Sequence, residues 1–258
     1  MEDIQSKTPS LSIPIDRVGV KNFRYPIVVR RKNNGTQHTV AKVTLYVDLP
    51  SEFKGTHMSR FIEALQEWSG VLDYQSFKEL LKDIQKRLKA RKSHLSISFP
   101  FFMENYAPKS GIKALMAYEC AFGGELEDKK LTMFLEVNVP VMTVCPCSLA
   151  ICERGAHSQR ANIKIRCEFE GLLWLEDLIM IARNSGSSPV YALLKRIDEK
   201  HVTEEAFANP VFVEDVVRRV AIQLKDHPLI KWFRVEVESF ESIHNHNAYA
   251  CIESKNRS

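Results

Sequence analysis

Two cysteines and a histidine form the first group of residues whose types and spacing could support chemistry. Cys145 and Cys147 are separated by a single proline, and His157 follows twelve residues after Cys145. Zinc prefers thiolate and imidazole ligands, and a site with fewer than four protein ligands leaves a position open for water. The lack of a second cysteine pair argues against a zinc finger. The spacing alone leaves two interpretations open, a metal site and a loop with two cysteines and a capping histidine.

A pair of histidines near the end of the chain is the second candidate. His244 and His246 stand two residues apart in the segment 240–249, which we expect to begin the last strand. Residues at i and i+2 of a strand lie on the same face. Imidazole titrates near neutral pH, so the pair suits acid–base catalysis or metal binding. A solvent-facing polar pair is the alternative.

Two carboxylates and one basic segment give weaker signals. Glu199 lies among charged residues after an expected helix, where an exposed loop carboxylate is the ordinary interpretation. Glu214 falls in the first turn of another expected helix, where an acid stabilises the helix dipole without further function. The segment 54–60, with two basic side chains and a histidine, precedes the first expected helix and could hold phosphate, although it lacks the P-loop pattern.

The elements that must position these residues follow a repeated order. In the first half we expect two strands, two helices and two strands, at residues 23–31, 38–49, 58–68, 74–91, 95–103 and 112–122. In the second half we expect two strands, three helical stretches and two strands, at residues 130–141, 161–170, 174–183, 189–196, 211–225, 229–240 and 244–252. The strands show alternating apolar residues, and the helices show apolar residues on one face.

This order predicts an α+β fold built by structural duplication of a ββααββ unit, with antiparallel sheets and paired helices. We expect a flexible tail at 1–15, a first half at 16–128 and a second half at 129–253, fused into one domain. The second half would carry most of the metal and catalytic residues. Unpaired sheet edges favour oligomerisation or closure into a β-barrel.

Composition limits the possible partners and location. The chain has 258 residues, 45% of them hydrophobic and 26% charged, with a net charge of +4 that is spread along it. Its densest basic run, Lys82–Lys92, lies on an amphipathic helical pattern, so we expect a solvated helix face and no nucleic-acid partner. No apolar run reaches the roughly 18 residues of a membrane span, and the N-terminus resembles no targeting segment. We therefore expect a cytoplasmic protein that does not bind membranes.

Seven segments resemble the type IB GTP cyclohydrolase I family, in register across almost the whole chain. They are KGTHMSR at 54–60, SFPFF at 98–102, CPCS at 145–148, GAHSQR at 155–160, LLKRIDEK at 193–200, NPVFVED at 209–215 and FESIHNHNAY at 240–249. The resemblance implies a bimodular tunnelling fold that assembles into a β-barrel homotetramer with active sites at subunit interfaces. It also implies hydrolysis of GTP at guanine C8, with formate release and rearrangement to 7,8-dihydroneopterin triphosphate for folate biosynthesis.

The resemblance also assigns a metal site. The family's ligands carry over to Cys145, His157 and Glu199, which would hold one divalent cation per active site. A mixed sulfur, nitrogen and oxygen set accepts zinc and also manganese or iron(II). Cys147 would be a second thiol near the site and a further catalytic candidate.

The remaining roles concern the substrate and the protons. The guanine-anchoring glutamate carries over to Glu214, and the paired catalytic histidines carry over to His244 and His246. A carboxylate can accept two hydrogen bonds from the N1–H and 2-amino edge of guanine. The other candidate substrate-binding residues are Lys54, His57, Arg60 and Glu241, the first three for the triphosphate.

Two other functions fit parts of the same pattern. One is a tunnelling-fold nitrile oxidoreductase, in which Cys145 or Cys147 would be a covalent nucleophile and NADPH would be consumed. The other is a non-catalytic metal-binding scaffold, which should unfold when its metal is chelated, whereas a catalytic site should lose activity with its fold intact.

Overall fold

A computed structural model of the protein describes residue 5 and residues 7–255 of the chain. Of the predicted tail, residues 1–4 and 6 lie outside this part. The chain forms two compact units, the first made of residues 1–100 and 121–134 and the second of residues 101–120 and 135–258. Three long strands, β4 (Lys92–Tyr106), β5 (Lys113–Glu127) and β6 (Lys130–Val144), contribute to both units. The division of the sequence into halves at residue 129 remains a prediction.

The first unit is built on a β-hairpin. Strand β1 (Ile15–Arg30) pairs antiparallel with β2 (Thr36–Leu49) and parallel with the short β3 (Val71–Leu72), and β2 pairs antiparallel with β4. From Ala41 to Leu49, every second side chain of β2 is buried, as the alternating pattern predicts. The hairpin turn places Asn34 at φ 62°, a conformation that asparagine tolerates. The predicted hairpin is confirmed, with a longer first strand.

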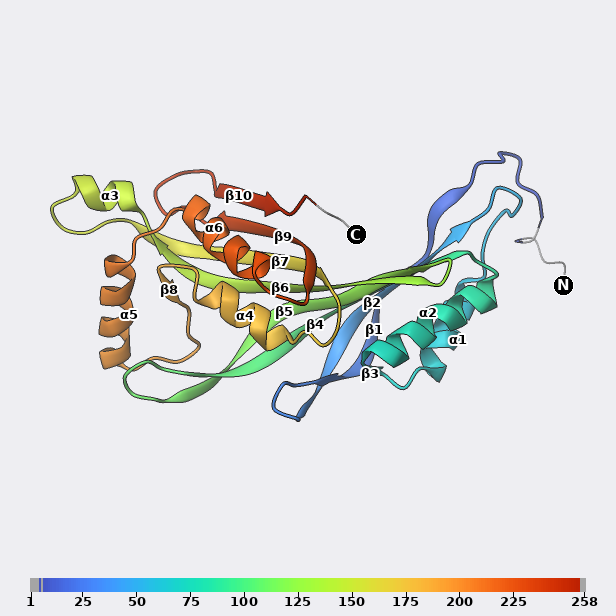
Figure 1. The fold of residues 1–258 in the computed structure, drawn as a ribbon, viewed down its shortest axis with the longest axis horizontal. Helices are drawn as coiled ribbons and strands as arrows, with labels where there is room; N and C mark the ends of the chain where they lie inside the picture. Colours follow the sequence, from blue (N-terminus) through green and yellow to red (C-terminus); the bar gives the residue numbers. More distant parts are fainter. Residues whose placement is uncertain (1–4, 6, 256–258) are drawn as a thin grey trace. The chain divides into compact units, whose positions relative to one another are not determined.

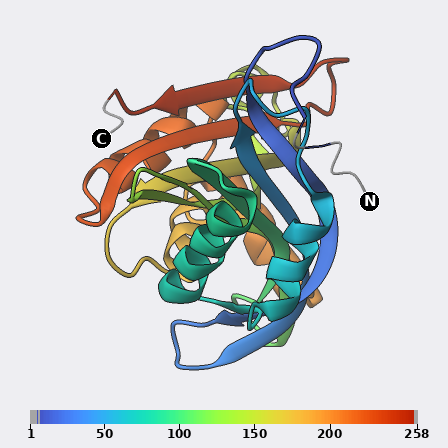
Figure 2. The same ribbon diagram turned by 90° about the vertical axis from the view of Figure 1, so that its right-hand side faces the viewer.

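Two helices complete the core of the first unit. Helices α1 (Met58–Glu67) and α2 (Tyr74–Leu88) lie side by side against the hairpin strands (Figure 2). Their apolar faces bury Phe61, Leu65 and Phe77 completely. The Asp73 carboxylate accepts from the backbone N–H of Ser76 at 2.9 Å, which caps the start of α2. The helices expected at 58–68 and 74–91 are confirmed.

The second unit contains most of the candidate site residues. Strand β7 (Ser158–Phe169) pairs antiparallel with β9 (Ile230–Ser239), which pairs antiparallel with β10 (Ala248–Glu253). Helices α4 (Leu175–Arg183) and α6 (Val213–Lys225) cover one face of these strands (Figure 1). The helix α3 (Pro146–Ile151) follows β6 directly. The loops at one end of these strands therefore come from distant parts of the sequence.

One expected helix is wrong. Residues 189–196 do not form a helix, because Ser188–Pro189 pairs with β6 as the short strand β8, and the helix α5 begins only at Arg196 and ends at Ala208. The start of α5 is fixed by Asp198, whose buried carboxylate accepts from the backbone N–H of Lys195 at 2.9 Å. Among the described residues, no helix is both long and apolar enough to cross a membrane.

Candidate active site

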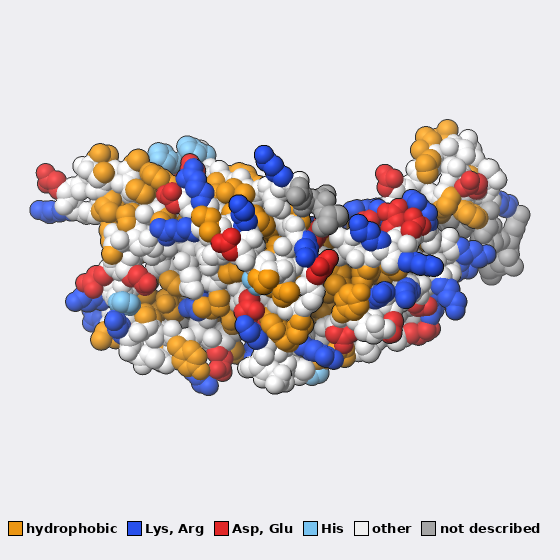
Figure 3. All heavy atoms as spheres, in the orientation of Figure 1, with side chains coloured by type: hydrophobic (Ala, Val, Ile, Leu, Met, Phe, Trp, Pro, Cys, Tyr) orange, Lys and Arg blue, Asp and Glu red, His pale blue; other side chains and the backbone are white. Residues whose placement is uncertain are grey.

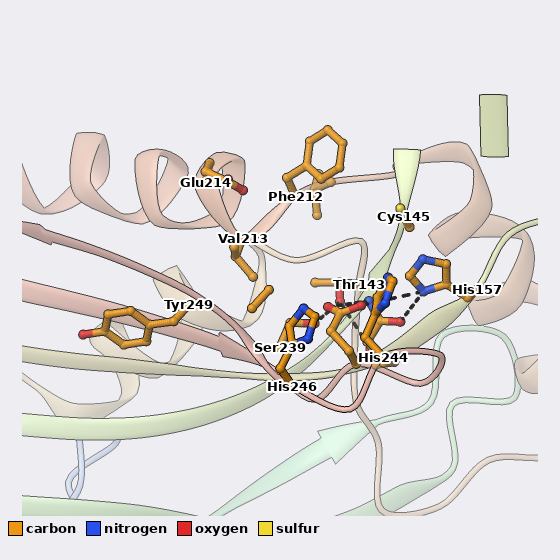
Figure 4. A pocket seen from close by; sticks show the side chains of 14 residues that line it. Thr143, Cys145, His157, Phe212, Val213, Glu214, Ser239, His244, His246 and Tyr249 are labelled. Atoms are coloured by element: carbon orange, nitrogen blue, oxygen red, sulfur yellow. Dashed lines mark hydrogen bonds and ion pairs between the residues drawn. The ribbon is translucent and has the colours of Figure 1, made fainter. Parts of the chain in front are cut away.

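A cavity of about 430 Å³ lies in the second unit, at the ends of β6, β7 and β9. Figure 4 shows the side chains that line it. The lining residues are Thr143, Cys145, His157, Gln159, Val211, Phe212, Val213, Glu214, Ser239, Glu241, His244, His246, Ala248 and Tyr249. Six of the residues singled out in the sequence, from four separate segments, thus border one cavity. A cavity of this size can hold a small molecule such as a nucleoside.

Backbone contacts between the strand ends bring these segments together. The backbone N–H of Cys145 donates to the carbonyl oxygen of His157 at 3.2 Å, so the end of β6 is tied to the start of β7. On the other side of β7, the N–H of Phe240 donates to the carbonyl of Arg160 at 2.9 Å. The site is therefore positioned by the sheet, which gives its loops a rigid base.

Ser148 links the cysteine to the histidine. The Cys145 sulfur accepts from the backbone N–H of Ser148 at 3.4 Å and so caps helix α3. The Ser148 hydroxyl in turn accepts from the backbone N–H of His157 at 3.3 Å. Cys147 and Cys152 are exposed on the same short segment, and neither lines the cavity. Cys145 is therefore the thiol whose position is fixed at the cavity.

The thiols of the core are chemically different. Cys120 and Cys167 are buried, and burial raises the pKa of the Cys167 thiol to about 12. A thiol that stays protonated is a poor nucleophile and a poor metal ligand. These cysteines belong to the packing of the sheet.

Three histidines gather beside the cavity. The ring of His244 stacks on that of His246 with centroids 5.2 Å apart, and it meets His157 edge to face at 6.3 Å. His244 and His246 lie in the connection before β10 and not in a strand, so the expected strand start at residue 244 is wrong. The rings of His244 and His246 still lie together, because the connection before β10 brings them side by side. Histidine side chains are visible at the surface over this connection (Figure 3).

Glu214 borders the cavity from the first turn of α6. Its neighbour Asp215 has the local role of cap, because the Asp215 carboxylate accepts from the backbone N–H of Phe212 at 3.1 Å. The helix start therefore does not require Glu214 as a capping acid. Its exposed carboxylate is placed to meet a ligand in the cavity.

Gln159 is a cavity residue to which the sequence analysis gave no role. Its side-chain oxygen lies 2.8 Å from Nδ1 of His157, and its amide nitrogen donates to Oε1 of Glu241 at 3.3 Å. The other Glu241 oxygen lies 3.9 Å from the same His157 nitrogen. The spacing of His157 and Gln159 at i and i+2 was a usable signal, because such residues share a face at a strand.

Glu199 lies elsewhere in the second unit. It is exposed in the first turn of α5, not in a loop after a helix, and it does not line the cavity. The neighbouring Asp198 is fully buried and accepts from both the backbone and the hydroxyl of Ser110, at 2.8 and 2.6 Å. Burial acts to raise the pKa of Asp198, but its hydrogen bonds outweigh this and hold the pKa well below its usual range.

The predicted phosphate segment belongs to the first unit. The backbone N–H of Lys54 donates to the carbonyl oxygen of Lys7 at 2.9 Å, and the guanidinium of Arg60 donates to the carbonyl oxygen of Arg87 at 2.9 Å. His57 stands at the N-cap position of α1 without a side-chain capping bond. These residues start a helix, as expected, and their role toward phosphate stays a prediction.

The donors at the cavity fit a divalent cation in part. Cys145 supplies a sulfur, and His157 supplies an imidazole whose Nδ1 is already occupied by Gln159. Sulfur and imidazole donors suit zinc and similar cations. Within residues 5 and 7–255, however, no group of three histidine, cysteine or acidic side chains is close enough together to hold a metal ion. Of the three predicted ligands, Cys145 and His157 border the cavity and Glu199 does not.

Solved structures with the same architecture are known. Uricase from Arthrobacter globiformis superimposes with a TM-score of 0.50 at 8% identity, over 94% of this chain and 95% of that protein. A mutant urate oxidase from Bacillus sp. TB-90 gives a TM-score of 0.51 at 11% identity, over 94% and 100% of the two chains. At this identity the likeness concerns the fold alone. It confirms the predicted α+β tunnelling fold, and the class is a tunnelling-fold protein with a cysteine- and histidine-lined cavity.

Sequence relatives identify the chain further. A family profile described as type I GTP cyclohydrolase folE2 matches residues 1–250. The GTP cyclohydrolase FolE2 of Desulfovibrio desulfuricans is 58% identical over 253 residues, 98% of this chain and 97% of that protein. The GTP cyclohydrolase FolE2 of Thermosipho africanus is 48% identical over 254 residues, 98% of each chain. This chain belongs to the type I GTP cyclohydrolase FolE2 family, which confirms the resemblance noted in its motifs.

Proposed function

We propose that the cavity beside Cys145 and His157 is the active site in which this GTP cyclohydrolase opens the guanine ring at C8. The activity follows from membership of the family. The observation that supports this location is the meeting of Cys145, His157, Glu214 and the His244–His246 pair at one cavity. Their segments are far apart in sequence, and local structure needs none of these side chains except Cys145, which caps α3.

Cys145, His157 and Glu199 would hold one divalent cation. Zinc, manganese or iron(II) suits this mixed donor set, and a bound cation would supply Lewis-acid activation of water for attack at C8. Glu199 must then approach the other two ligands when the site is assembled. Cys147 would remain a second thiol close to the site.

Glu214 would orient the substrate. An ionised carboxylate accepts hydrogen bonds only, so it matches the N1–H and 2-amino donors of guanine. Adenine presents an acceptor at N1 and would leave the carboxylate poorly paired. Orientation of the ring and selection against ATP would then depend on one side chain.

His244 and His246 would transfer protons during ring opening, formate release and closure of the pterin ring. These steps each need an acid and a base, and two stacked imidazoles can take opposite protonation states. Lys54, His57 and Arg60 would bind the triphosphate, in the same or a neighbouring subunit. We further propose a homotetramer assembled around a β-barrel, and a cytoplasmic location.

The two alternative functions are less well supported. The relatives described above, at 48–58% identity over nearly the whole chain, carry the name GTP cyclohydrolase FolE2. This favours neither a nitrile oxidoreductase nor a non-catalytic scaffold. The test is incubation of metal-loaded protein with GTP, followed by assays for formate and, after oxidation, for a fluorescent pterin.

Matched variants make this test specific for the cavity. We expect Cys145→Ala and Glu214→Ala to abolish or strongly reduce both products. Glu52→Ala replaces an exposed residue that does not line the cavity, and it should retain activity. Full activity of the Cys145 or Glu214 variant would place the active site elsewhere.

A further inference from the structure

The side chain of Gln159 separates a histidine from a carboxylate at the edge of the cavity. Its oxygen faces Nδ1 of His157 at 2.8 Å, and its nitrogen faces Glu241 at 3.3 Å. Both neighbours are nearly buried, with side-chain exposures of 11% for His157 and 10% for Glu241. Water therefore has little access to compete for these contacts.

The orientation of the amide follows from the carboxylate. An ionised carboxylate only accepts hydrogen bonds, so the Gln159 group facing Glu241 must be the NH₂ donor. The amide oxygen then points to His157, and there it also accepts from the hydroxyl of Ser242 at 3.3 Å. The contact with the carboxylate therefore fixes the orientation, whereas a hydroxyl can donate or accept and fits either one; this matters because amide oxygen and nitrogen are assigned from such networks.

The orientation of the amide determines where His157 carries its proton. Because the amide oxygen is only an acceptor, Nδ1 of the neutral ring must be the donor, and Nε2 is left with its lone pair. In Figure 4 the dashed contacts leave one nitrogen of His157, while the other nitrogen is on the ring edge towards Cys145. Nε2, which carries the lone pair, is therefore the ring nitrogen outside the contacts with Gln159 and Glu241.

We propose that Gln159, oriented by Glu241, is a positioning residue that holds His157 as the Nδ1–H tautomer with Nε2 prepared to bind a divalent cation. The proposal rests on the metal assignment made above. It gives Glu241 a role in orienting the amide instead of the substrate contact predicted from the family resemblance. Hydrogen-bond partners of a metal-binding histidine raise the affinity for the metal, because they fix the tautomer and the orientation of the imidazole ring.

The test is made on the metal-free full-length protein. Long-range ¹⁵N–¹H NMR correlations of the histidine rings report the tautomer directly, at a pH above about 8 where imidazole is neutral. The signals of His157 are assigned as those lost in His157→Asn. The affinity for Zn²⁺ alone is measured in parallel by competition with a chromophoric chelator. Thermal unfolding of each variant shows that it is folded.

Three variants separate the proposed role from simple packing. Gln159→Met keeps the shape without the hydrogen bonds, and we expect a shift towards the Nε2–H tautomer and a 10- to 100-fold weaker affinity for Zn²⁺. Glu241→Gln lets the amide turn and should give a smaller shift of the same sign. The effect of Glu241→Gln should disappear in a Gln159→Met background, because both act through one amide. Gln223→Met, at an exposed position of helix α6, is the matched control and should change neither quantity.

The outcomes distinguish this proposal from the function it rests on. A wild-type His157 with its proton on Nε2, or a Gln159→Met variant with unchanged tautomer and affinity, overturns the role of Gln159 and leaves the cyclohydrolase assignment intact. A Zn²⁺ affinity that is unchanged in His157→Asn overturns the metal assignment itself. A tautomer shift together with weaker Zn²⁺ binding supports both.

Discussion

Two nearly buried histidines, one in each unit, are held through the same ring nitrogen by different partners. Nδ1 of His94 contacts the Glu125 carboxylate directly at 2.9 Å, and Lys92 pairs with the same carboxylate. Nδ1 of His157 meets a neutral amide, with its carboxylate one step further away. In the first arrangement a carboxylate contacts the ring directly, whereas in the second an amide makes the close contact and the carboxylate lies farther away, 3.9 Å from Nδ1. Burial and an acidic neighbour therefore do not by themselves mark a catalytic histidine.

The largest expected effect comes from replacing His157 or His94 by asparagine, one at a time. His157→Asn removes a proposed metal ligand, and we expect kcat to fall about 10⁴-fold or more, because Lewis-acid activation supplies several kcal/mol. His94→Asn should leave kcat nearly unchanged and lower the free energy of unfolding by about 1–3 kcal/mol, since it breaks a buried contact to a carboxylate. Steady-state assays measure kcat, metal analysis measures the bound metal, and chemical denaturation measures the free energy of unfolding. A fully stable His94→Asn enzyme without activity would contradict the comparison.

The exposed histidines of the cavity should give the next largest effect. We expect His244→Asn or His246→Asn to lower kcat about 10²- to 10³-fold, with a smaller change in KM for GTP. The effect is in the lower part of the range for proton-transfer groups, because the stacked partner remains beside the reacting atoms. His38→Asn, on the exposed face of β2, is the control. A loss confined to KM would make the pair a binding element.

The sequence predicted the elements, and several of the residues that border the cavity, better than the contacts between them. The buried alternation of β2 and the apolar faces of α1 and α2 are local patterns, and they indicated the right structure. The start of α5 depends on Asp198 and Ser110, which are 88 residues apart. The link from Gln159 to Glu241 spans 82 residues. Periodicity contains no information on such long-range contacts, which is why a helix was wrongly expected at 189–196 and why the link from Gln159 to Glu241 was not predicted.

Within the described part of the chain no contact joins Glu214 to a histidine, unlike Glu125 and Glu241, so its substitution tests an acid of the cavity by itself. We expect Glu214→Gln to lower kcat/KM for GTP roughly 10- to 100-fold, since hydrogen bonds to a charged group contribute about 1.5–3 kcal/mol. Discrimination against ATP should fall in the same variant. Asp215→Asn, one residue away, should affect only the stability of α6, by about 1 kcal/mol or less. Equal kinetic losses in the two variants would indicate a disturbed helix and not a lost contact.

The smallest effect concerns the pH dependence of stability at His94. Burial lowers the pKa of His94, and Arg17 and Lys92 act in the same direction, against Glu125 and Asp48. The unfolded chain therefore binds a proton at His94 at a higher pH than the folded chain does. Above the ordinary pKa of about 6.5 this difference has no effect, and below it the free energy of unfolding decreases until the folded pKa is reached.

His94→Gln should remove this part of the slope and leave the rest of the profile unchanged. The measurement is chemical denaturation of wild type, His94→Gln and His38→Gln between about pH 5 and 8. Acids with lowered pKa, such as Glu127, contribute at lower pH, because their stabilisation is lost only as the pH falls through their own range. A His94→Gln profile parallel to that of the wild type would mean that the attraction of Glu125 cancels the effects of burial and of Lys92, so that folding leaves the pKa of His94 unchanged.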